Sequence, residues 1–171
     1  LPEELFPETS RNRNFRTYPR NNPVSGAGVE SIMLAAEAVT AAMNLDDLRN
    51  CQAEEDLAGC THRTILELGY RAYRRPLTDP EAATLTRYLD HGQSPEQALK
   101  SAVELILQSP QFLYLDTVAM EDVVAPDVSH MTDFTVGARL AFFLTDTTPD
   151  AVLLDAAARG ELRTRDQVAA Q

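Results

Sequence analysis

The fold is decided by residues 78–115, which read TDPEAATLTRYLDHGQSPEQALKSAVELILQSPQFLYL. Thr78 followed by Glu81 has the spacing of a capping box, in which each side chain satisfies a backbone amide of the first helical turn. Ser94 followed by Gln97 repeats this pattern, with a proline at the first helical position. The stretch therefore predicts two consecutive helices.

The end of this stretch predicts a break and a short further element. Ser109-Pro110 interrupts the second helix, because proline lacks the amide that a helix interior needs. We expect one or two helical turns from Pro110 through the apolar residues 111–115, although periodicity alone leaves a buried strand as the alternative.

Apolar residues recur at three- and four-residue spacings on both sides of this stretch, which is typical of amphipathic helices. Further helices are predicted over 29–44, 59–75, 132–144, 148–160 and from 164 onward. The first should face the core with Val29, Ile32, Met33, Ala36, Val39 and Met43, and Gly160 should provide a left-handed cap. Nothing predicts a paired sheet. The sequence thus predicts an all-α fold, an irregular array of about six to eight short helices.

The remaining segments suggest how the chain is divided. Residues 1–28 contain four prolines and no helical period, so we expect an extended lead-in. Residues 116–131 are expected to form an acidic connector. These expectations leave a helical domain over 29–115 and the start of a following helical domain over 132–171. We also expect the chain to be a segment of a longer protein.

The charge of the chain argues against a nucleic-acid partner, and its hydropathy argues against a membrane span. The net charge of −11 argues against nucleic acid, because neutralising phosphates requires clustered lysines and arginines. The longest apolar run, residues 136–144, contains Arg139 and is far shorter than the roughly 20 residues that span a bilayer. We therefore expect no nucleic-acid partner and no membrane span.

Two cysteines carry the main argument about compartment. A disulfide between Cys51 and Cys60 would close a short polar loop, contribute about 2–3 kcal/mol and imply an oxidising compartment. The alternative is a metal site formed by these cysteines and His62, although a second ligand pair at zinc-finger spacing is missing. The sequence also lacks the Cys-x-x-Cys-His pattern of covalently attached haem, so we expect no cofactor in this segment.

Three arginines, Arg71, Arg74 and Arg75, precede Pro76. A guanidinium can hold a carboxylate through two parallel hydrogen bonds, and Glu81 is the nearest candidate. We interpret the cluster as structural, with anion binding as the alternative. The acidic groups, such as residues 54–56, are interpreted as solvated surface in so acidic a chain. No catalytic motif is present, and the sequence assigns no enzymatic activity.

Two motifs resemble a known family. Residues 71–78, RAYRRPLT, followed by Glu81, and residues 107–114, LQSPQFLY, resemble the bacterial domain of unknown function numbered fifteen ninety-five. Residues 137–144, GARLAFFL, and the segment 149–162 resemble the start of the domain numbered fifteen ninety-two. The lead-in resembles the tail of a preceding domain. The motif residues are Arg71, Arg74, Arg75, Pro76, Glu81, Ser109, Pro110, Phe112, Tyr114 and Arg139.

The resemblance implies a setting rather than an activity. Such domains occur in order within large exported bacterial proteins, some of which carry a c-type cytochrome domain. It implies a periplasmic or extracellular location, with haem present only through other domains or partners.

Three hypotheses about function follow. The first is a non-catalytic helical scaffold or interaction module. The alternative is part of an extracellular enzyme acting on a polymeric substrate, with a site completed by missing domains. A haem- or metal-dependent redox module is the third. An apolar helical face with Phe134, Phe142, Val152 and Leu153 is expected to contact remaining domains or another chain.

Overall fold

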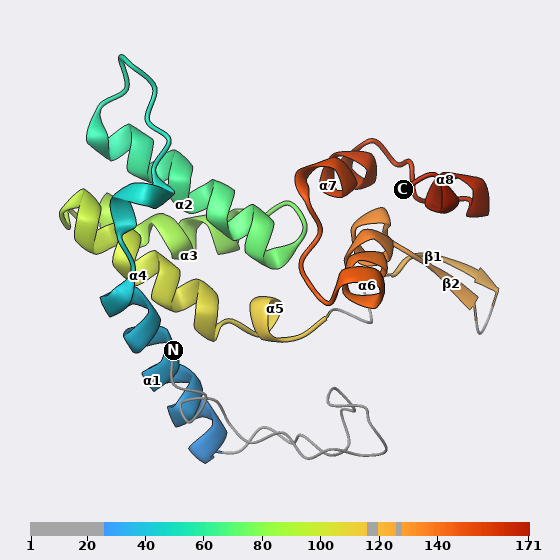
Figure 1. Ribbon diagram of the computed structural model, residues 1–171, viewed down its shortest axis with the longest axis horizontal. Helices are drawn as coiled ribbons and strands as arrows, with labels where there is room; N and C mark the ends of the chain where they lie inside the picture. The colour runs from blue at the N-terminus through green and yellow to red at the C-terminus, as the bar shows by residue number, and fades with distance from the viewer. Residues whose placement is uncertain (1–25, 116–119, 126–127) are drawn as a thin grey trace.

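The computed structural model describes residues 26–115, 120–125 and 128–171. Its first part contains α1 (Gly26–Ala42), the 3₁₀ helix η3 (Leu45–Leu48), α2 (Leu57–Tyr73), α3 (Asp79–Asp90), α4 (Pro95–Gln108) and α5 (Pro110–Leu113). Its second part contains β1 (Met120–Ala125), β2 (Val128–Met131), α6 (Asp133–Thr145), α7 (Ala151–Ala158) and α8 (Arg165–Ala169). Figure 1 shows these two groups side by side. The predominantly helical fold class is confirmed.

The helices of the first part are arranged around α4, which packs against α1, α2 and α3. We call α1–α5 the N-terminal unit (residues 26–113). Its core is a cluster of apolar side chains from α2, α3 and α4, consisting of Ile65, Tyr73, Leu85, Leu99, Ala102, Val103 and Ile106. Gly69 lets α2 approach α3 closely, because a Cβ atom there would lie 2.7 Å from Leu85 Cδ1 and 2.9 Å from Leu77 Cδ1.

Helices α6, α7 and α8 form what we call the C-terminal unit (residues 133–169). α6 packs against α7, and a second apolar cluster is centred on Ala156, Ala157 and Leu162. Asp133, buried at the start of α6, accepts hydrogen bonds from the Leu162 amide (2.9 Å) and from Arg163 Nε (2.9 Å). Asp133 therefore ties the chain after α7 to the start of α6. Gly160 adopts the predicted left-handed conformation, with φ of 70°.

The helix starts predicted at Thr78 and Ser94 are present in the structure. Glu81 accepts a hydrogen bond from the Thr78 amide (2.9 Å), and Ser94 Oγ accepts one from the Gln97 amide (3.3 Å). The short segment after Ser109 is a helical turn, α5, rather than a strand. Side-chain capping by polar residues, together with proline in the first turn, thus sets the borders of these helices.

Three details differ from the sequence predictions. β1 and β2 pair in an antiparallel hairpin within the segment expected to be an acidic connector, so the expectation of no paired sheet was wrong. The valines at 123, 124 and 128 favour strands, and the sequence Pro-Asp at 126–127 is a common turn former. The first helix begins at Gly26, inside the expected lead-in, whose residues 1–25 lie outside the described part.

The core-facing stripe of α1 also differs from the prediction. Of the predicted residues, Val29 and Met33 are 53% and 41% exposed, whereas Ala36 is buried as predicted. Ala35 and Thr40, which were not predicted, are buried beside it. Helix α1 is apolar on most of its circumference, so periodicity gave little guidance on which side would pack against α4. Thr40 instead forms a hydrogen bond with Glu104 of α4 (2.8 Å).

Among the described residues, no helix combines the length and apolar character required to cross a bilayer.

Candidate functional site

The chain turns sharply after α2. Tyr73 is the last helical residue, and Arg74 adopts the left-handed conformation with φ of 60°. This conformation is uncommon for a residue with a Cβ atom. It ends the helix two residues before Pro76, which could not continue it. The turn also directs two adjacent arginines to different parts of the structure.

Arg74 is buried, with only 5% of its surface exposed, and binds the backbone of α5. Its guanidinium donates hydrogen bonds to the carbonyls of Gln111 (2.6 Å), Phe112 (3.3 Å) and Tyr114 (2.9 Å), as well as Ala72 (3.0 Å). The last carbonyls of a helix lack partners within that helix and carry partial negative charge. Arg74 therefore holds a one-turn helix that would be weak alone. Burial lowers the pKa of its guanidinium, and the neighbouring Arg75 adds to this effect.

The same part of α2 contacts the C-terminal unit. The Arg74 guanidinium lies over the ring of Phe142, 5.9 Å from its centroid. One turn earlier, Tyr70 meets Phe134 edge to face, with ring centroids 6.4 Å apart and planes at 84°. Both phenylalanines belong to α6. The end of α2 therefore contacts both α5 and α6.

Arg75 forms the bidentate pair with Glu81 that the sequence suggested. Its NH1 and NH2 groups donate to Glu81 Oε2 (2.9 Å) and Oε1 (2.8 Å). Because Oε2 also accepts from the Thr78 amide, the pair joins the end of α2 to the start of α3. The hydrogen bonds from Arg75, reinforced by Thr78, lower the pKa of Glu81 to about 2. Glu81 is thus an ionised structural group rather than a proton donor near neutral pH.

The predicted disulfide between Cys51 and Cys60 is present, with the Cα atoms 5.2 Å apart. It joins the loop before α2 to the first turn of this helix, where Cys60 is fully buried. Because the two sulfurs are bonded to each other, the alternative metal site through their thiolates is ruled out. The described part of the chain also contains no cluster of three metal-binding side chains.

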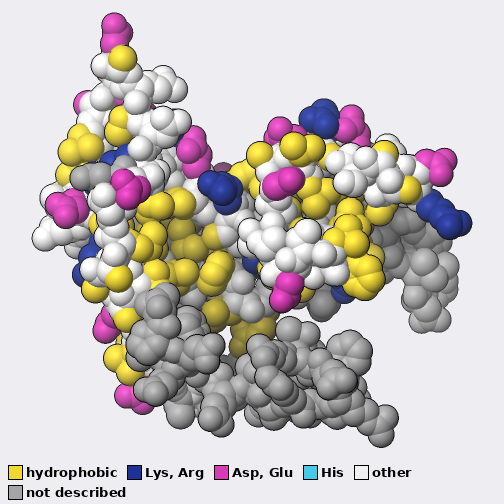
Figure 2. Space-filling view, viewed as in Figure 1, with side chains coloured by type: hydrophobic (Ala, Val, Ile, Leu, Met, Phe, Trp, Pro, Cys, Tyr) yellow, Lys and Arg dark blue, Asp and Glu magenta, His cyan; other side chains and the backbone are white. Residues whose placement is uncertain are grey.

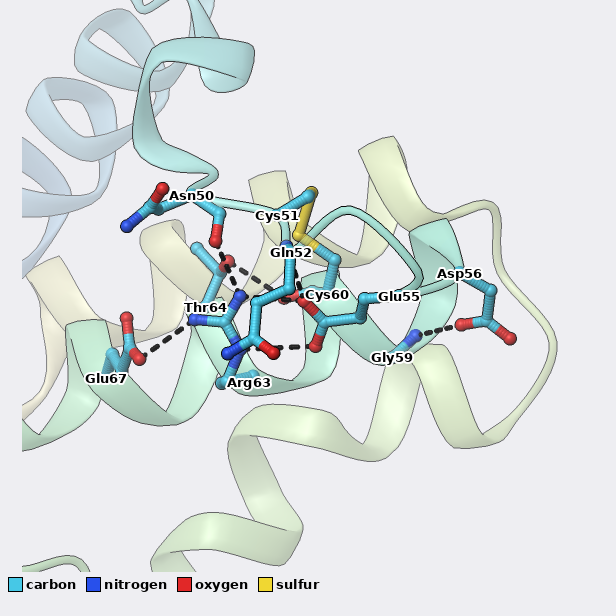
Figure 3. Close-up of polar contacts among 10 residues, drawn as sticks. All are labelled: Asn50, Cys51, Gln52, Glu55, Asp56, Gly59, Cys60, Arg63, Thr64 and Glu67. Carbon is cyan, nitrogen blue, oxygen red and sulfur yellow. Dashed lines mark hydrogen bonds and ion pairs between the residues drawn. A yellow bond between two sulfur atoms is a disulfide. The ribbon is translucent and has the colours of Figure 1, made fainter.

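Arg63 holds the disulfide loop from the helix side (Figure 3). Its guanidinium donates to Glu55 Oε1 (3.2 Å) and Oε2 (2.8 Å), to Glu67 (3.0 Å) and to the Asn50 carbonyl (2.6 Å). The hydrogen bond with Glu55 raises the pKa of Arg63, and the same contact lowers the pKa of Glu55. Asp56 caps α2 by accepting from the Gly59 amide (2.6 Å). The loop is therefore fixed by a covalent bond and by an ion-pair network.

Sequence reasoning missed Arg63 and Asp133 and assigned Glu55 to solvated surface. The four-residue spacing of Arg63 and Glu67 on one helix was a usable signal. By contrast, the contacts from Asp133 to Leu162 and Arg163 span about thirty residues, and nothing in the local pattern announces them.

The other motif residues occupy separate positions. Ser109 Oγ donates to the Ile106 carbonyl (2.8 Å) and accepts from the Phe112 amide (3.3 Å), which joins α4 to α5. Phe112 is half-buried against the first core, whereas Tyr114 is exposed. Arg71, Pro76, Pro110 and Arg139 are also exposed.

An open cleft of about 390 Å³ lies between α3, α4 and α5. Its lining consists of Tyr73, Pro80, Glu81, Thr84, Leu85, Leu105, Gln108, Ser109 and Gln111. Glu81 is the single carboxylate of this lining and is already bound by Arg75. A second carboxylate, which acid–base cleavage of a polymer would require, is not part of it.

The predicted apolar face of the C-terminal unit is partly covered within the chain. Phe134, Phe142 and Leu153 are half-buried, whereas Val152 is 67% exposed. Phe143 and Leu144, at the end of α6, are 85% and 64% exposed. Figure 2 shows hydrophobic side chains on the surface around α6 and α7. The large apolar side chains exposed in this unit are therefore Phe143, Leu144 and Val152, of which only Val152 was predicted.

Two family models match the chain. Residues 60–116 match PSD5, a protein of unknown function (DUF1595), and residues 131–171 match PSD4, a protein of unknown function (DUF1592). Neither a curated protein nor a solved structure matches. Both domains expected from the sequence motifs are thus found, in the expected order. The first match includes α2 from Cys60 onward and α3 to α5, with the contacts of Arg74 and Arg75, and the second includes α6 to α8.

Proposed function

We propose that this chain, in which a DUF1595 match is followed by a DUF1592 match, is a non-catalytic helical scaffold or interaction module of a larger exported bacterial protein. The proposal rests on the contacts of Arg74 and Arg75, the two charged residues at the end of α2. Arg74 binds backbone carbonyls, and Arg75 binds Glu81. These contacts stabilise the fold of the chain itself.

The electrostatics support the same proposal. An acid–base pair for hydrolysis requires two carboxyl groups whose environments separate their pKa values. The carboxylate of the cleft has a pKa of about 2 because Arg75 binds it, so it stays ionised at the pH of most compartments. This arrangement favours a scaffold over the enzyme alternative.

Export is supported by the disulfide, since disulfides persist mainly in oxidising compartments. The proposed location is the periplasm or the extracellular space. We assign no cofactor to this segment, and any association with a c-type cytochrome system would depend on haem held by other domains or partners. A Soret absorbance band in the full-length protein would support this association.

The proposed contact surface is the exposed apolar face of Phe143, Leu144 and Val152, and its proposed occupant is another domain of the same polypeptide. All three are large apolar side chains exposed to solvent, and exposed apolar patches often mark interaction sites. The test places a photo-crosslinking residue at Phe143 in the full-length protein, with the same residue at exposed Gln97 of α4 as a matched control. Peptide mapping should find a crosslink from position 143 to another domain and little from position 97.

The crosslinking is carried out on protein recovered from the periplasmic fraction. If the photo-crosslinking residue at position 143 captures no protein segment, the proposed contact surface is wrong. Recovery of the native protein only from the cytoplasm, with Cys51 and Cys60 reduced, would contradict export. Capture of a separate protein chain would replace the intramolecular occupant with an external partner.

A further inference from the structure

We infer that the C-terminal unit docks onto α2 as a separable body through one joint, formed by Tyr70, Arg74, Phe134 and Phe142, and that docking stabilises α5. The inference deepens the proposed function, on which it rests, by identifying the internal contact that would set the orientation of the two family-matched segments. Figure 1 shows α6 and α7 beside the end of α2 that carries this joint.

The spacing of the four residues suits one contact between two elements. Tyr70 lies in the last turn of α2, and Arg74 is the residue that caps this helix. Phe134 and Phe142 are eight residues apart on α6, about two turns, and so lie on one side of that helix. Tyr70 receives Phe134 edge to face, and Arg74 receives the ring of Phe142. Both are favourable geometries for an aromatic ring.

Arg74 connects this contact to α5. Its guanidinium donates hydrogen bonds to the carbonyls of Gln111, Phe112 and Tyr114 and also lies over the ring of Phe142. While Phe142 covers the guanidinium, water competes less well for these hydrogen bonds. Loss of docking would expose them to water and weaken the hold on a single helical turn. Docking of α6 and order in α5 should therefore rise and fall together.

The joint is small enough to open. α6 packs more extensively on α7 than on α2, and Phe134 and Phe142 are half-buried rather than fully enclosed. The two apolar clusters are also separate, one in each unit. Burial at the joint raises the pKa of the Tyr70 phenol, and the charge of Asp155 on α7 adds to this effect. Each unit can thus keep its own core while the joint changes.

The test compares Phe142→Ala with Phe143→Ala. These adjacent phenylalanines have the same size, but Phe142 lies under Arg74 whereas Phe143 is 85% exposed. Spin labels on cysteines introduced at exposed Gln97 (α4) and Ala158 (α7) report the distance between the units. The native cysteines are bonded to each other and do not take the label.

The parent and Phe143→Ala should give one narrow distance distribution, and Phe142→Ala should give a broad one. Hydrogen exchange at the amides of Leu113 and Tyr114 should accelerate about tenfold in Phe142→Ala, as expected for losing one desolvated cation–ring contact. Helical content by circular dichroism shows that each variant is folded. Arg74→Lys is a second variant that tests the hold on α5. The lysine ammonium cannot replace the planar guanidinium that binds three carbonyls of this segment.

If the spin-label distance distribution of Phe142→Ala is as narrow as that of the parent, the inference that this joint orients the C-terminal unit is wrong. A broad distribution with unchanged exchange at Leu113 and Tyr114 would overturn the coupling to α5. Equal effects of Phe142→Ala and Phe143→Ala would show that the exposed face, rather than the joint, orients the C-terminal unit. All these measurements use this chain alone, so their failure is distinguishable from the failure of the crosslinking test.

Discussion

Replacing Glu81 with glutamine tests the electrostatic link between α2 and α3. Glutamine has the same size as glutamate and also occurs at the third position of capping boxes, so it can still accept from the Thr78 amide. The change therefore removes mainly the negative charge that Arg75 binds. We expect a loss of about 1–2 kcal/mol in the free energy of unfolding at pH 7.

The magnitude follows from the pKa of Glu81. A fall from 4.5 to about 2 is a difference of about 2.5 pH units, which corresponds to at most about 3.4 kcal/mol at 1.36 kcal/mol per unit. The Arg75 and Glu81 side chains are 29% and 18% exposed. Solvent and salt screen a pair of this kind, which reduces the expected contribution to about 1–2 kcal/mol.

The pH dependence has a definite sign. The pKa of Glu81 is lower in the folded protein than in the unfolded chain, so the pair stabilises the fold fully above the unfolded pKa. This stability is lost as pH falls through the folded value of about 2. The difference in unfolding free energy between the parent and Glu81→Gln should therefore stay constant from pH 7 to pH 5 and decline toward zero near pH 2.

Urea unfolding at pH 7, 5, 4 and 3 measures this difference, and the other acidic groups cancel because both proteins carry them. A double-mutant cycle with Arg75→Gln isolates the pair, and Arg75→Lys separates the charge from the two-point geometry. A coupling energy near zero, or a difference that does not change with pH, would refute the assigned role.

Three further variants test other parts of the structure. Replacing Cys51 and Cys60 with serine should cost about 2–3 kcal/mol, measured by urea unfolding, although the Arg63 network should keep the loop ordered; an unchanged unfolding free energy would contradict a constraining disulfide. Gly69→Ala should lower the melting temperature, since the strain of overpacking costs about 1–3 kcal/mol against a gain of about 1 kcal/mol in helix propensity; a higher melting temperature would show that α3 yields. Asp133→Ala should accelerate hydrogen exchange of the Leu162 amide, and unchanged protection would mean that another group holds this segment.

Helix borders were predictable because their signals are local. Thr78, Ser94 and Pro110 each mark a start through the chemistry of the first turn, which requires no knowledge of the tertiary structure. The disulfide was predictable for a related reason, since Cys51 and Cys60 are separated by only nine positions in sequence. Local chemistry therefore accounts for most of the fold class.

The remaining features depend on distant contacts. The paired strands β1 and β2 lie in a segment where short apolar runs alternate with acidic residues, so the strand signals are short. The side of α1 that packs on α4 was ambiguous because apolar residues surround most of the helix. Phe134 and Phe142 contact Tyr70 and Arg74, which lie about 65 positions earlier in the chain. No local sequence pattern could therefore identify these contacts.

The two adjacent arginines show why composition alone could not assign their roles. Both precede Pro76, and the sequence offered Glu81 as a partner for either. The left-handed turn at Arg74 separates them, because it directs the Arg74 guanidinium into the interior while Arg75 stays near the start of α3. A buried charge requires several hydrogen bonds to offset its desolvation, and the carbonyl end of α5 supplies them. A half-exposed charge needs only a carboxylate, and Glu81 is within reach. The backbone conformation of one residue thus decides which arginine joins α2 to α3 and which one joins α2 to α5 and α6.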